Sequence, residues 1–494
     1  MYTTMKKSIL TISAIIAASA VMAQSEDDAL RFSQTYQQGT ARSAAMGGAF
    51  GALGGDLSVL ATNPAGMSIY KDGEFSFTPC FGNITTNTTI NGFDKEDSKF
   101  NFKMSNFGFV TSHHNGNEGG FSGFAFGMTF NRLNDFSANN RVYGRNDNSS
   151  HLDLWSEDSR GTNPDRLFWA NFLPLEAQLM NIVDSTDWVY SNMFHRAGAS
   201  YGEYQKFVQT VKGGINSWDF AFSGVYAEKV FFGASLGIQS VNYKNVATYS
   251  ELDINDVVDF NDFDFKEEVH MRGSGINFKA GLIYKPVNFL RFGAAIHTPT
   301  FYSLTNKYYY HLNAVFDSDI DIAPQDKISD NMDYEFRFTS PFKAILSGAF
   351  IVPNYGLISV DYEYVDYTKA KYETNEEDNH DFDAENTNIK EKFKATKNLR
   401  IGVEGLVGQI SLRGGYAMYG NPNKFVADDI QRQIISAGIG FRGDGFYLDF
   451  AGTYHIYNTE EYLYGSPMYS DLPSQSYTVD RNHLYIMATL GFKF

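Results

Sequence analysis

Hydrophobic and polar residues alternate with a period of two along much of this chain. Over residues 484–494 the even positions carry Leu, Ile, Ala, Leu, Phe and Phe, whereas the odd positions carry Tyr, Met, Thr, Gly and Lys. Successive side chains of a β-strand point to opposite faces, so one face of this segment is wholly apolar. A tilted strand needs roughly 9–11 residues to cross a bilayer. The segment therefore predicts a membrane-spanning strand that ends at Phe494.

The same alternation recurs upstream, with charged side chains on one face of each segment. Arg291, for example, lies between Leu290 and Phe292. A charge is costly where a barrel strand faces lipid, so we expect these charges to face the lumen. Fourteen segments of this kind predict an all-β, 14-stranded antiparallel transmembrane barrel. They lie near residues 74–86, 99–112, 120–136, 217–227, 230–251, 267–285, 288–312, 334–351, 355–371, 392–407, 409–419, 432–442, 445–459 and 482–494.

The connections between these segments alternate between short turns and long polar loops. The short turns include residues 227–229, 353–356, 407–409 and 443–445. In outer-membrane barrels short turns face the periplasm and long loops face the exterior. The alternation therefore predicts that both ends of the barrel lie on the periplasmic side.

The N-terminus has the pattern of a secretion signal. Lys6 and Lys7 precede an apolar run over residues 8–22, and small residues lead to a cleavage site after Ala23. No later apolar run reaches the roughly eighteen residues of a membrane helix. The single cysteine, Cys80, cannot form an intramolecular disulfide. We therefore expect a protein of the bacterial outer membrane from which residues 1–23 are removed.

Composition agrees with a barrel and bears on its partners. Aromatic residues make up 16% of the chain, which fits the aromatic girdles of an outer-membrane barrel. The formal net charge is -17, whereas phosphate binding needs clustered Lys and Arg, so we expect no nucleic acid as a partner. We expect a monomer in contact with outer-membrane lipid and lipopolysaccharide.

Residues 24–73 precede the first predicted strand and are rich in glycine and alanine. They lack the charge and proline of disordered segments. Fourteen strands enclose a lumen that side chains of the wall leave partly open. We interpret residues 24–73 as a plug inside the barrel of residues 74–494, and a disordered periplasmic arm is the alternative.

The plug segment contains a short motif, Asn63, Pro64, Ala65 and Gly66, within "ARSAAMGGAFGALGGDLSVLATNPAGMSIY". This order resembles the N-terminal hatch of the FadL/TodX family of outer-membrane transporters for long-chain fatty acids and other hydrophobic compounds. The resemblance implies a fourteen-stranded barrel with a hatch in its lumen. It also implies passive uptake, in which outer loops capture a hydrophobic or amphipathic molecule, a lumen pocket holds it, and it leaves sideways at a strand kink.

The third predicted strand carries Gly120, Gly123 and Gly127. Glycine within a strand permits a bulge or a bend, and the resemblance implies a kink in this strand. The alternative is that these glycines accommodate barrel curvature or neighbouring side chains.

The longest predicted loop, residues 137–216, is unusually apolar and includes Leu167, Phe168, Trp169 and Phe172. It forms either a capture groove at the outer mouth or a mini-core that closes the barrel. It is the second outer loop, whereas the large capture loops of the family come later. The capture site therefore cannot be transferred residue by residue.

An acidic ligand such as a fatty acid would need a cation in the lumen. Lys279 and four arginines fall on lumen-facing positions. Of these, Arg291, Arg400 and Arg413 are our candidates for ligand binding. The alternative is an ion-pair network with lumen carboxylates.

Other functions have less support in the sequence. The apolar strand faces carry no Ser–His pair of the kind a barrel lipase needs, so we expect no enzyme. No EF-hand or zinc spacing is present, and we expect no metal or cofactor. The alternatives to transport are a docking protein in surface export and a haemin receptor, for which His113 and His114 would be the candidate ligands.

Overall fold

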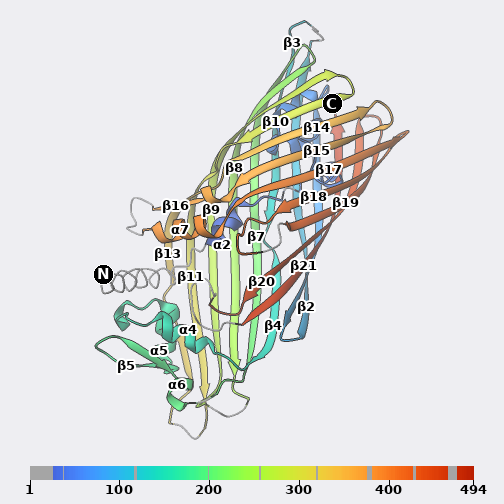
Figure 1. Cartoon of the computed structure of the whole chain (residues 1–494). Helices are drawn as coiled ribbons and strands as arrows, with labels where there is room; N and C mark the ends of the chain where they lie inside the picture. The colour runs from blue at the N-terminus through green and yellow to red at the C-terminus, as the bar shows by residue number, and fades with distance from the viewer. Residues whose placement is uncertain are drawn as a thin grey trace, which may run out of the picture.

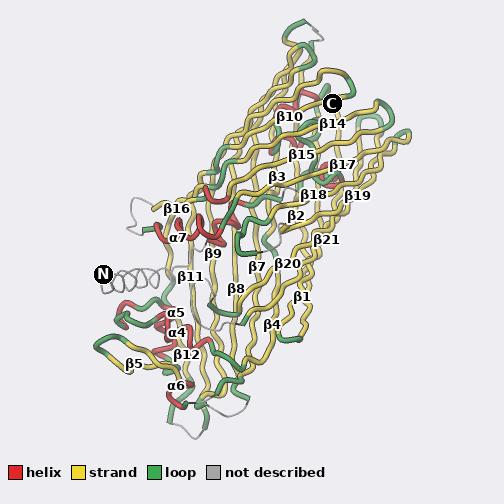
Figure 2. Tube along the Cα trace, viewed as in Figure 1, coloured by secondary structure: helices red, strands yellow, loops and turns green. Residues whose placement is uncertain are grey.

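The period-two segments form one antiparallel sheet that closes on itself (Figures 1 and 2). The computed structural model describes residues 26–36, 38–115, 119–198, 200–254, 258–318, 321–374, 381–426, 430–465 and 475–494. The predicted signal peptide lies outside these residues. β1 (Glu74–Ile90) pairs with β2 (Phe93–His114) on one side and with β21 (Ser476–Lys493) on the other, so the first strand joins the last.

The barrel has fourteen antiparallel strands, which confirms the predicted fold. Four of them consist of two elements that continue one another. In chain order, the strands that follow β1 and β2 are β3 (Phe121–Asp135) with β4 (Ala138–Asn146), β7 (Glu203–Tyr226), β8 (Val230–Leu252), β9 (Phe260–Val287), β10 (Leu290–His297) with β11 (Phe301–Phe316), β13 (Met332–Thr339) with β14 (Lys343–Val352), β15 (Gly356–Asp366) with β16 (Lys371–Thr374), β17 (Ala395–Val407), β18 (Ile410–Gly420), β19 (Ile430–Arg442), β20 (Phe446–Tyr462) and β21.

Side chains alternate between the two faces of the wall as predicted. Phe446 and Phe450 are exposed on the outer face of β20, whereas Asp449 between them is buried. In β21, Ile486 is 53% exposed and its neighbour Tyr485 only 2%. Exposed Phe, Leu, Ile and Tyr side chains recur on the outer face around the barrel. A continuous apolar band of this kind is suited to lipid contact.

The N-terminal segment, residues 26–73, runs inside the ring of strands, where Figure 1 shows it in blue. Its helix α3 (Ala41–Ala45) contacts β18, β19, β20 and β21. Its turn η2 (Pro64–Ile69) contacts β3, β7, β8 and β9, on a different part of the wall. The segment also contains α2 (Glu26–Ser33) and η1 (Leu57–Ala61). Small residues fit here because the wall approaches closely: a Cβ at Gly47 would lie 3.0 Å from the Tyr416 carbonyl oxygen.

The outer insertion is shorter than the predicted 137–216. β4 extends the third strand to Asn146 and β7 begins at Glu203, because the alternation continues there with larger polar residues, so the insertion covers residues 147–202. It contains α4 (His151–Asp158), η3 (Pro164–Arg166), α5 (Trp169–Glu176), α6 (Met193–Ala197) and the hairpin of β5 (Met180–Asp184) and β6 (Val189–Asn192). Figure 1 places the insertion at one end of the barrel and the short turns at the other.

Trp155 in α4 is buried against Phe263 and Phe265 of β9, with ring centroids 5.5 and 5.1 Å apart. These contacts support the mini-core interpretation of the insertion. Three small elements complete the outer end: β12 (Gln325–Ile328), η4 (Tyr367–Lys369) and α7 (Asp383–Lys392). Within the described ranges, no helix has the length and apolar character needed to span a membrane.

Candidate functional site in the barrel lumen

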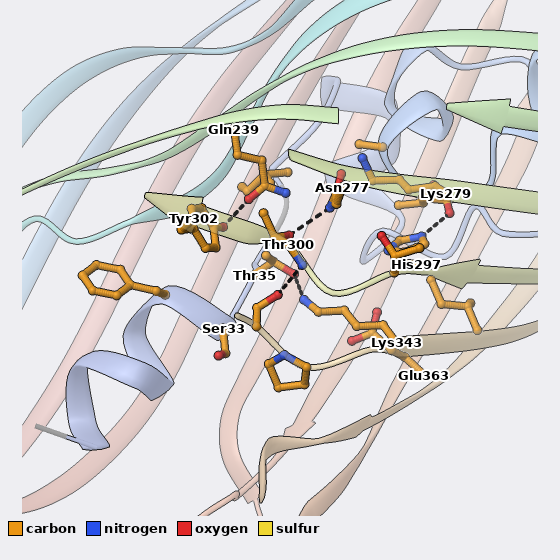
Figure 3. Close-up of a pocket in the computed structure, with 18 of the residues that line it drawn as sticks. Ser33, Thr35, Gln239, Asn277, Lys279, His297, Thr300, Tyr302, Lys343 and Glu363 are labelled. Carbon is orange, nitrogen blue, oxygen red and sulfur yellow. Dashed lines mark hydrogen bonds between the residues drawn. The ribbon is translucent and has the colours of Figure 1, made fainter. Parts of the chain in front are cut away.

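A cavity of about 50 Å³ lies between the N-terminal segment and the wall strands β3, β8, β9, β10, β11, β14, β15 and β17 (Figure 3). Phe32, Ser33 and Thr35 border it from the N-terminal segment. Charged and polar side chains of the wall dominate the rest of its lining. They are Gln239, Asn277, Lys279, His297, Lys343, Glu363 and Arg400.

Three cationic side chains face this cavity, and two of them are neutralised by carboxylates. Lys279 Nζ lies 2.5 Å from Asp219 Oδ1. Arg400 Nη1 lies 3.2 Å from Glu363 Oε2, and its Nη2 lies 3.8 Å from Asp361 Oδ2. Both cations therefore belong to ion pairs of the wall.

Lys343 is the third cation and has a different partner. Its Nζ donates to Thr35 Oγ1 of the N-terminal segment at 2.8 Å, a bond drawn in Figure 3. Among the described residues no carboxylate oxygen lies within 4.0 Å of this nitrogen. Because Lys343 is only 9% exposed, its charge has limited access to water. Of the three cations that line this cavity, Lys343 is the one that forms no ion pair within 4.0 Å, although Glu363 acts on its charge from farther away.

His297 closes the cavity on the side of η1. Its Nε2 lies 2.6 Å from the Thr62 carbonyl oxygen, so this nitrogen is the donor. The contact ties β10 to the N-terminal segment at the edge of the cavity, as Figure 3 shows.

Of the three predicted ligand-binding arginines, only Arg400 lines the cavity. Arg413 is fully buried between Glu404 and Asp449, at 2.5 and 2.6 Å, so the ion-pair alternative holds for it. Arg291 donates to the Leu53 carbonyl oxygen of the N-terminal segment and is not part of the cavity lining. The period-two pattern placed all three on the inner face but could not show what covers them.

Lys343 was not among the residues predicted to bind a ligand, although the alternation along its strand places it on the inner face. Lys343 alternates with Ala344 and shares the inner face of β14 with Ile345. Its partner Thr35 could not be predicted, because that contact joins residues about three hundred positions apart.

The motif Asn63-Pro64-Ala65-Gly66 has a packing role in this structure. Asn63 caps η2 by accepting from Ala65 N at 3.2 Å, and its Nδ2 donates to the carbonyl oxygens of Gly51 and Leu282 at 2.6 and 3.3 Å. Pro64 begins the turn, where its missing N–H is not needed. A Cβ at Gly66 would lie 2.8 Å from Gly54 Cα, so glycine is required for this approach.

Two further contacts anchor the N-terminal segment to the wall. Arg42 donates to Glu404 through two bonds of 3.0 and 2.9 Å. Asp361 of β15 accepts from the backbone N–H groups of Phe50 and Gly51 at 3.1 and 3.0 Å. These are charge-assisted bonds, which are stronger than neutral ones.

The third strand is irregular at one of its three predicted glycines and at a second position without glycine. Gly120 lies in the turn before β3, and Gly127 lies against Met67 of η2. The register of β3 against β7 shifts between Phe121 and Gly123, and again between Arg132 and Asn134. The second shift is at the cavity, because Leu133 lines it. Gly123 is thus at a bulge, whereas the bulge beside the cavity contains no glycine.

Metal binding and haemin binding have little support among the described residues. No group of three or more His, Cys, Asp or Glu side chains is placed there to hold a metal ion. His113 and His114 end β2, and neither is part of the cavity lining.

Known structures share this fold at low sequence identity. A FadL homologue of Pseudomonas aeruginosa is 12% identical, with a TM-score of 0.54 over 92% of this chain and 98% of that one. The toluene transporter TodX of Pseudomonas putida is 13% identical, with a TM-score of 0.51 over 93% and 98%. The toluene transporter TbuX of Ralstonia pickettii is 13% identical, with a TM-score of 0.50 over 92% and 98%.

No family model and no curated protein matches the sequence. The likeness to solved structures is therefore one of fold, and it extends over nearly the whole of each chain. The chain has the fold of the FadL-type barrels.

Proposed function

We propose that this barrel resides in the outer membrane and takes up amphipathic molecules passively, with an apolar body and an anionic head, such as long-chain fatty acids. The fold supports transport of hydrophobic compounds, because the similar structures include a FadL homologue and two toluene transporters. The choice of an acid rests on the polar cavity, where Lys343 Nζ donates to the Thr35 hydroxyl and Glu363 acts on its charge from beyond ion-pair distance.

The outer half of the lumen suits the apolar body of such a molecule. Aromatic rings form a continuous cluster from the insertion to the cavity. Phe265 stacks on Tyr310 with centroids 5.7 Å apart, and Tyr302 stacks on Phe338 at 6.1 Å. Phe32, which borders the cavity, lies edge-on to Phe338 at 6.1 Å. Rings of this kind offer apolar contact to an alkyl chain.

The cavity suits the head group. A carboxylate in place of the Thr35 hydroxyl would give Lys343 a charge-assisted bond. Arg400 and Lys279 would add positive potential at the same cavity. An uncharged hydrocarbon gains nothing from these groups, so the lumen favours an acid over toluene.

The N-terminal segment acts as the hatch in this proposal, and it must move. The cavity measures about 50 Å³, and Phe32, Ser33 and Thr35 of the N-terminal segment border it. An alkyl acid fits only if Phe32, Ser33 and Thr35 shift from the cavity. The ligand then leaves sideways through the wall near the irregular third strand, without an aqueous channel.

Titration of the purified barrel with a fluorescent long-chain fatty acid tests this function. Lys343→Met should raise the Kd about tenfold or more, because a charge-assisted hydrogen bond is worth roughly 1.5–3 kcal/mol. Lys343→Arg, which keeps the charge, should bind nearly as well as the native barrel. Lys397→Met, on the exposed face of β17, is the matched control and should change nothing.

Two results would reject the proposal. One is native affinity in the Lys343→Met barrel. The other is equal affinity for the fatty alcohol of the same length, since an alcohol carries no anionic head.

A further inference from the structure

The wall contains a seam where two neighbouring strands are not paired. β2 pairs with β3 only from Asn106 to His114, opposite residues 123–131. Beyond that point residues 93–105 of β2 pair with no described strand other than β1, and β3 and β4 pair with none other than β7. We call this unpaired boundary the seam. Unpaired backbone at membrane depth is tolerated where it is buried in protein or lines a cavity.

The N-terminal segment covers the seam from the lumen. Tyr36 N donates to the Leu133 carbonyl oxygen at 2.7 Å, and Gln38 N donates to that of Arg132 at 3.4 Å. Ser105 Oγ of β2 donates to the Gly39 carbonyl oxygen at 2.6 Å. The segment therefore occupies the edge that β2 leaves free on β3. Since Leu133 also lines the cavity, the seam begins where the ligand would sit.

A buried polar cluster closes the middle of the seam. Asp135 of β3 forms an ion pair with Lys103 of β2, and it lies 3.4 Å from Arg132 Nη2. Its carboxylate also accepts from Asn101 Nδ2 at 3.2 Å and from the Tyr485 hydroxyl at 3.3 Å. The side chains of Asp135 and Lys103 are 3% and 7% exposed. Side chains therefore make the closure here, and farther out β4 packs on β1 and β2, where Arg141 Nε lies 2.7 Å from Asp97 Oδ2.

An apolar ledge lies on the outside next to this cluster. Phe100 and Phe102 flank Asn101 on β2 and are 69% and 60% exposed. Both lie against Phe81 of β1, with centroids 6.2 and 5.1 Å apart. The path from Leu133 past Asp135 to these rings leads from the cavity to the outer apolar face.

We propose that the Lys103–Asp135 ion pair, which we call the lock, keeps this seam closed, and that breaking it opens the wall between the cavity and the surrounding lipid. The proposal rests on the proposed function for what passes through, but not for whether the seam opens. A strand edge held by a few side-chain contacts opens locally at a lower cost than a paired one. Arg132 favours opening when Asp135 loses its charge, because it then faces Lys103 as a like charge.

Cys80 provides a native reporter of the opening. It is the only cysteine of the chain, it is fully buried, and it lies directly opposite Lys103 in the pairing of β1 with β2. Cys80 also packs near Ala41 and Ala45 of the N-terminal segment, so reagent reaches it when the seam opens and this segment shifts with it. The test measures the rate at which N-ethylmaleimide labels Cys80 in the full-length barrel reconstituted in phospholipid vesicles.

Asp135→Asn should increase the labelling rate about tenfold or more, because removing one partner of a buried ion pair leaves the other uncompensated. The double variant Lys103→Asp/Asp135→Lys should return the rate toward the native value, because it restores the pair with its charges exchanged. Glu96→Gln, an exposed carboxylate on the same strand, should leave the rate unchanged.

Native labelling in a folded Asp135→Asn barrel would overturn the lock. So would a double variant that labels as fast as the single one, because a general loss of packing would not respond to charge exchange. Labelling needs no ligand, so a barrel that fails to bind fatty acid but shows the expected labelling would reject the proposed substrate and support the lock.

Discussion

The cationic side chains of the lumen differ in whether they form ion pairs with carboxylates. Arg413 lies between two carboxylates, as a fully buried charge requires. Lys343 donates to a hydroxyl, which a carboxylate could replace, and Glu363 acts on its charge from beyond ion-pair distance. The difference between these two cations is the basis for assigning the head-group site to Lys343.

Asn63 holds the N-terminal segment through its cap of η2 and its two donor bonds, which a substitution can test. Asn63→Ala removes the cap of η2 and two donor bonds, so the segment around it should open more easily by about 1–3 kcal/mol. Hydrogen exchange of amides in residues 51–69 should accelerate about 10- to 100-fold, as that free energy implies. Asn83→Ala, exposed on the outer face of β1, is the control. Unchanged exchange in Asn63→Ala would show that the motif does not hold the segment.

The sequence could place residues on the inner face but could not pair them. Burial of Arg400 and Arg413 follows from alternation, because a charge facing lipid is costly. Whether a carboxylate lies opposite depends on cross-strand register, as for Glu404 opposite Arg413. The contact of Lys343 with Thr35 depends in addition on the path of the N-terminal segment.

Among the elements, the insertion is attached to the barrel through a buried carboxyl group. Glu251, near the outer end of β8 and beyond the apolar band, accepts from His151 N at 2.8 Å and from Gln205 Nε2 at 2.9 Å. Burial raises the pKa of Glu251 to about 7, although its hydrogen-bond donors lower it. Burial also raises the pKa of Glu203, at the start of β7, to about 7.

These pKa values predict a pH-dependent attachment. Between pH 4.5 and about 7 both carboxyl groups keep their protons when the insertion is docked and lose them when it is detached. The docked state is therefore favoured most below pH 4.5, and this advantage is lost as the pH rises through 7. Protection of α4 amides, corrected for intrinsic exchange, should fall about tenfold or more from pH 5.5 to 8.

Glu251→Gln should reduce this pH dependence, because an amide does not titrate in the range. Asp165→Asn, an exposed carboxyl in η3, should retain it. Protection that stays constant with pH in the native protein would contradict the assigned role of Glu251.

Element positions were predictable where a local pattern specifies them. Fourteen strands follow from the alternation, and the short turns between them follow from their length. The second irregularity of the third strand, between Arg132 and Asn134, was not predicted, because it arises where β2 diverges and Tyr36 and Gln38 bond to β3 instead. Gly127 misled the prediction because close packing against Met67 also requires a small residue.

At the scale of the whole molecule, the structure is a closed barrel with the N-terminal segment in its lumen. The cavity of about 50 Å³ does not amount to an open channel. Passage of a long molecule therefore requires movement of the N-terminal segment at the inner site and of the seam in the wall. Both lie next to Leu133, so one displacement of residues 32–38 would affect the cavity and the seam together.

The central claim is that an amphipathic acid binds in the lumen with its carboxylate at Lys343. The most direct test is a crystal structure of the barrel with a long-chain fatty acid that carries bromine at its terminal carbon, located by anomalous scattering. We predict bromine among the aromatic rings near Phe338 and a carboxylate within hydrogen-bond distance of Lys343 Nζ, with Thr35 displaced. A lumen without the acid, or an acid bound only on the outer apolar face, would contradict the account.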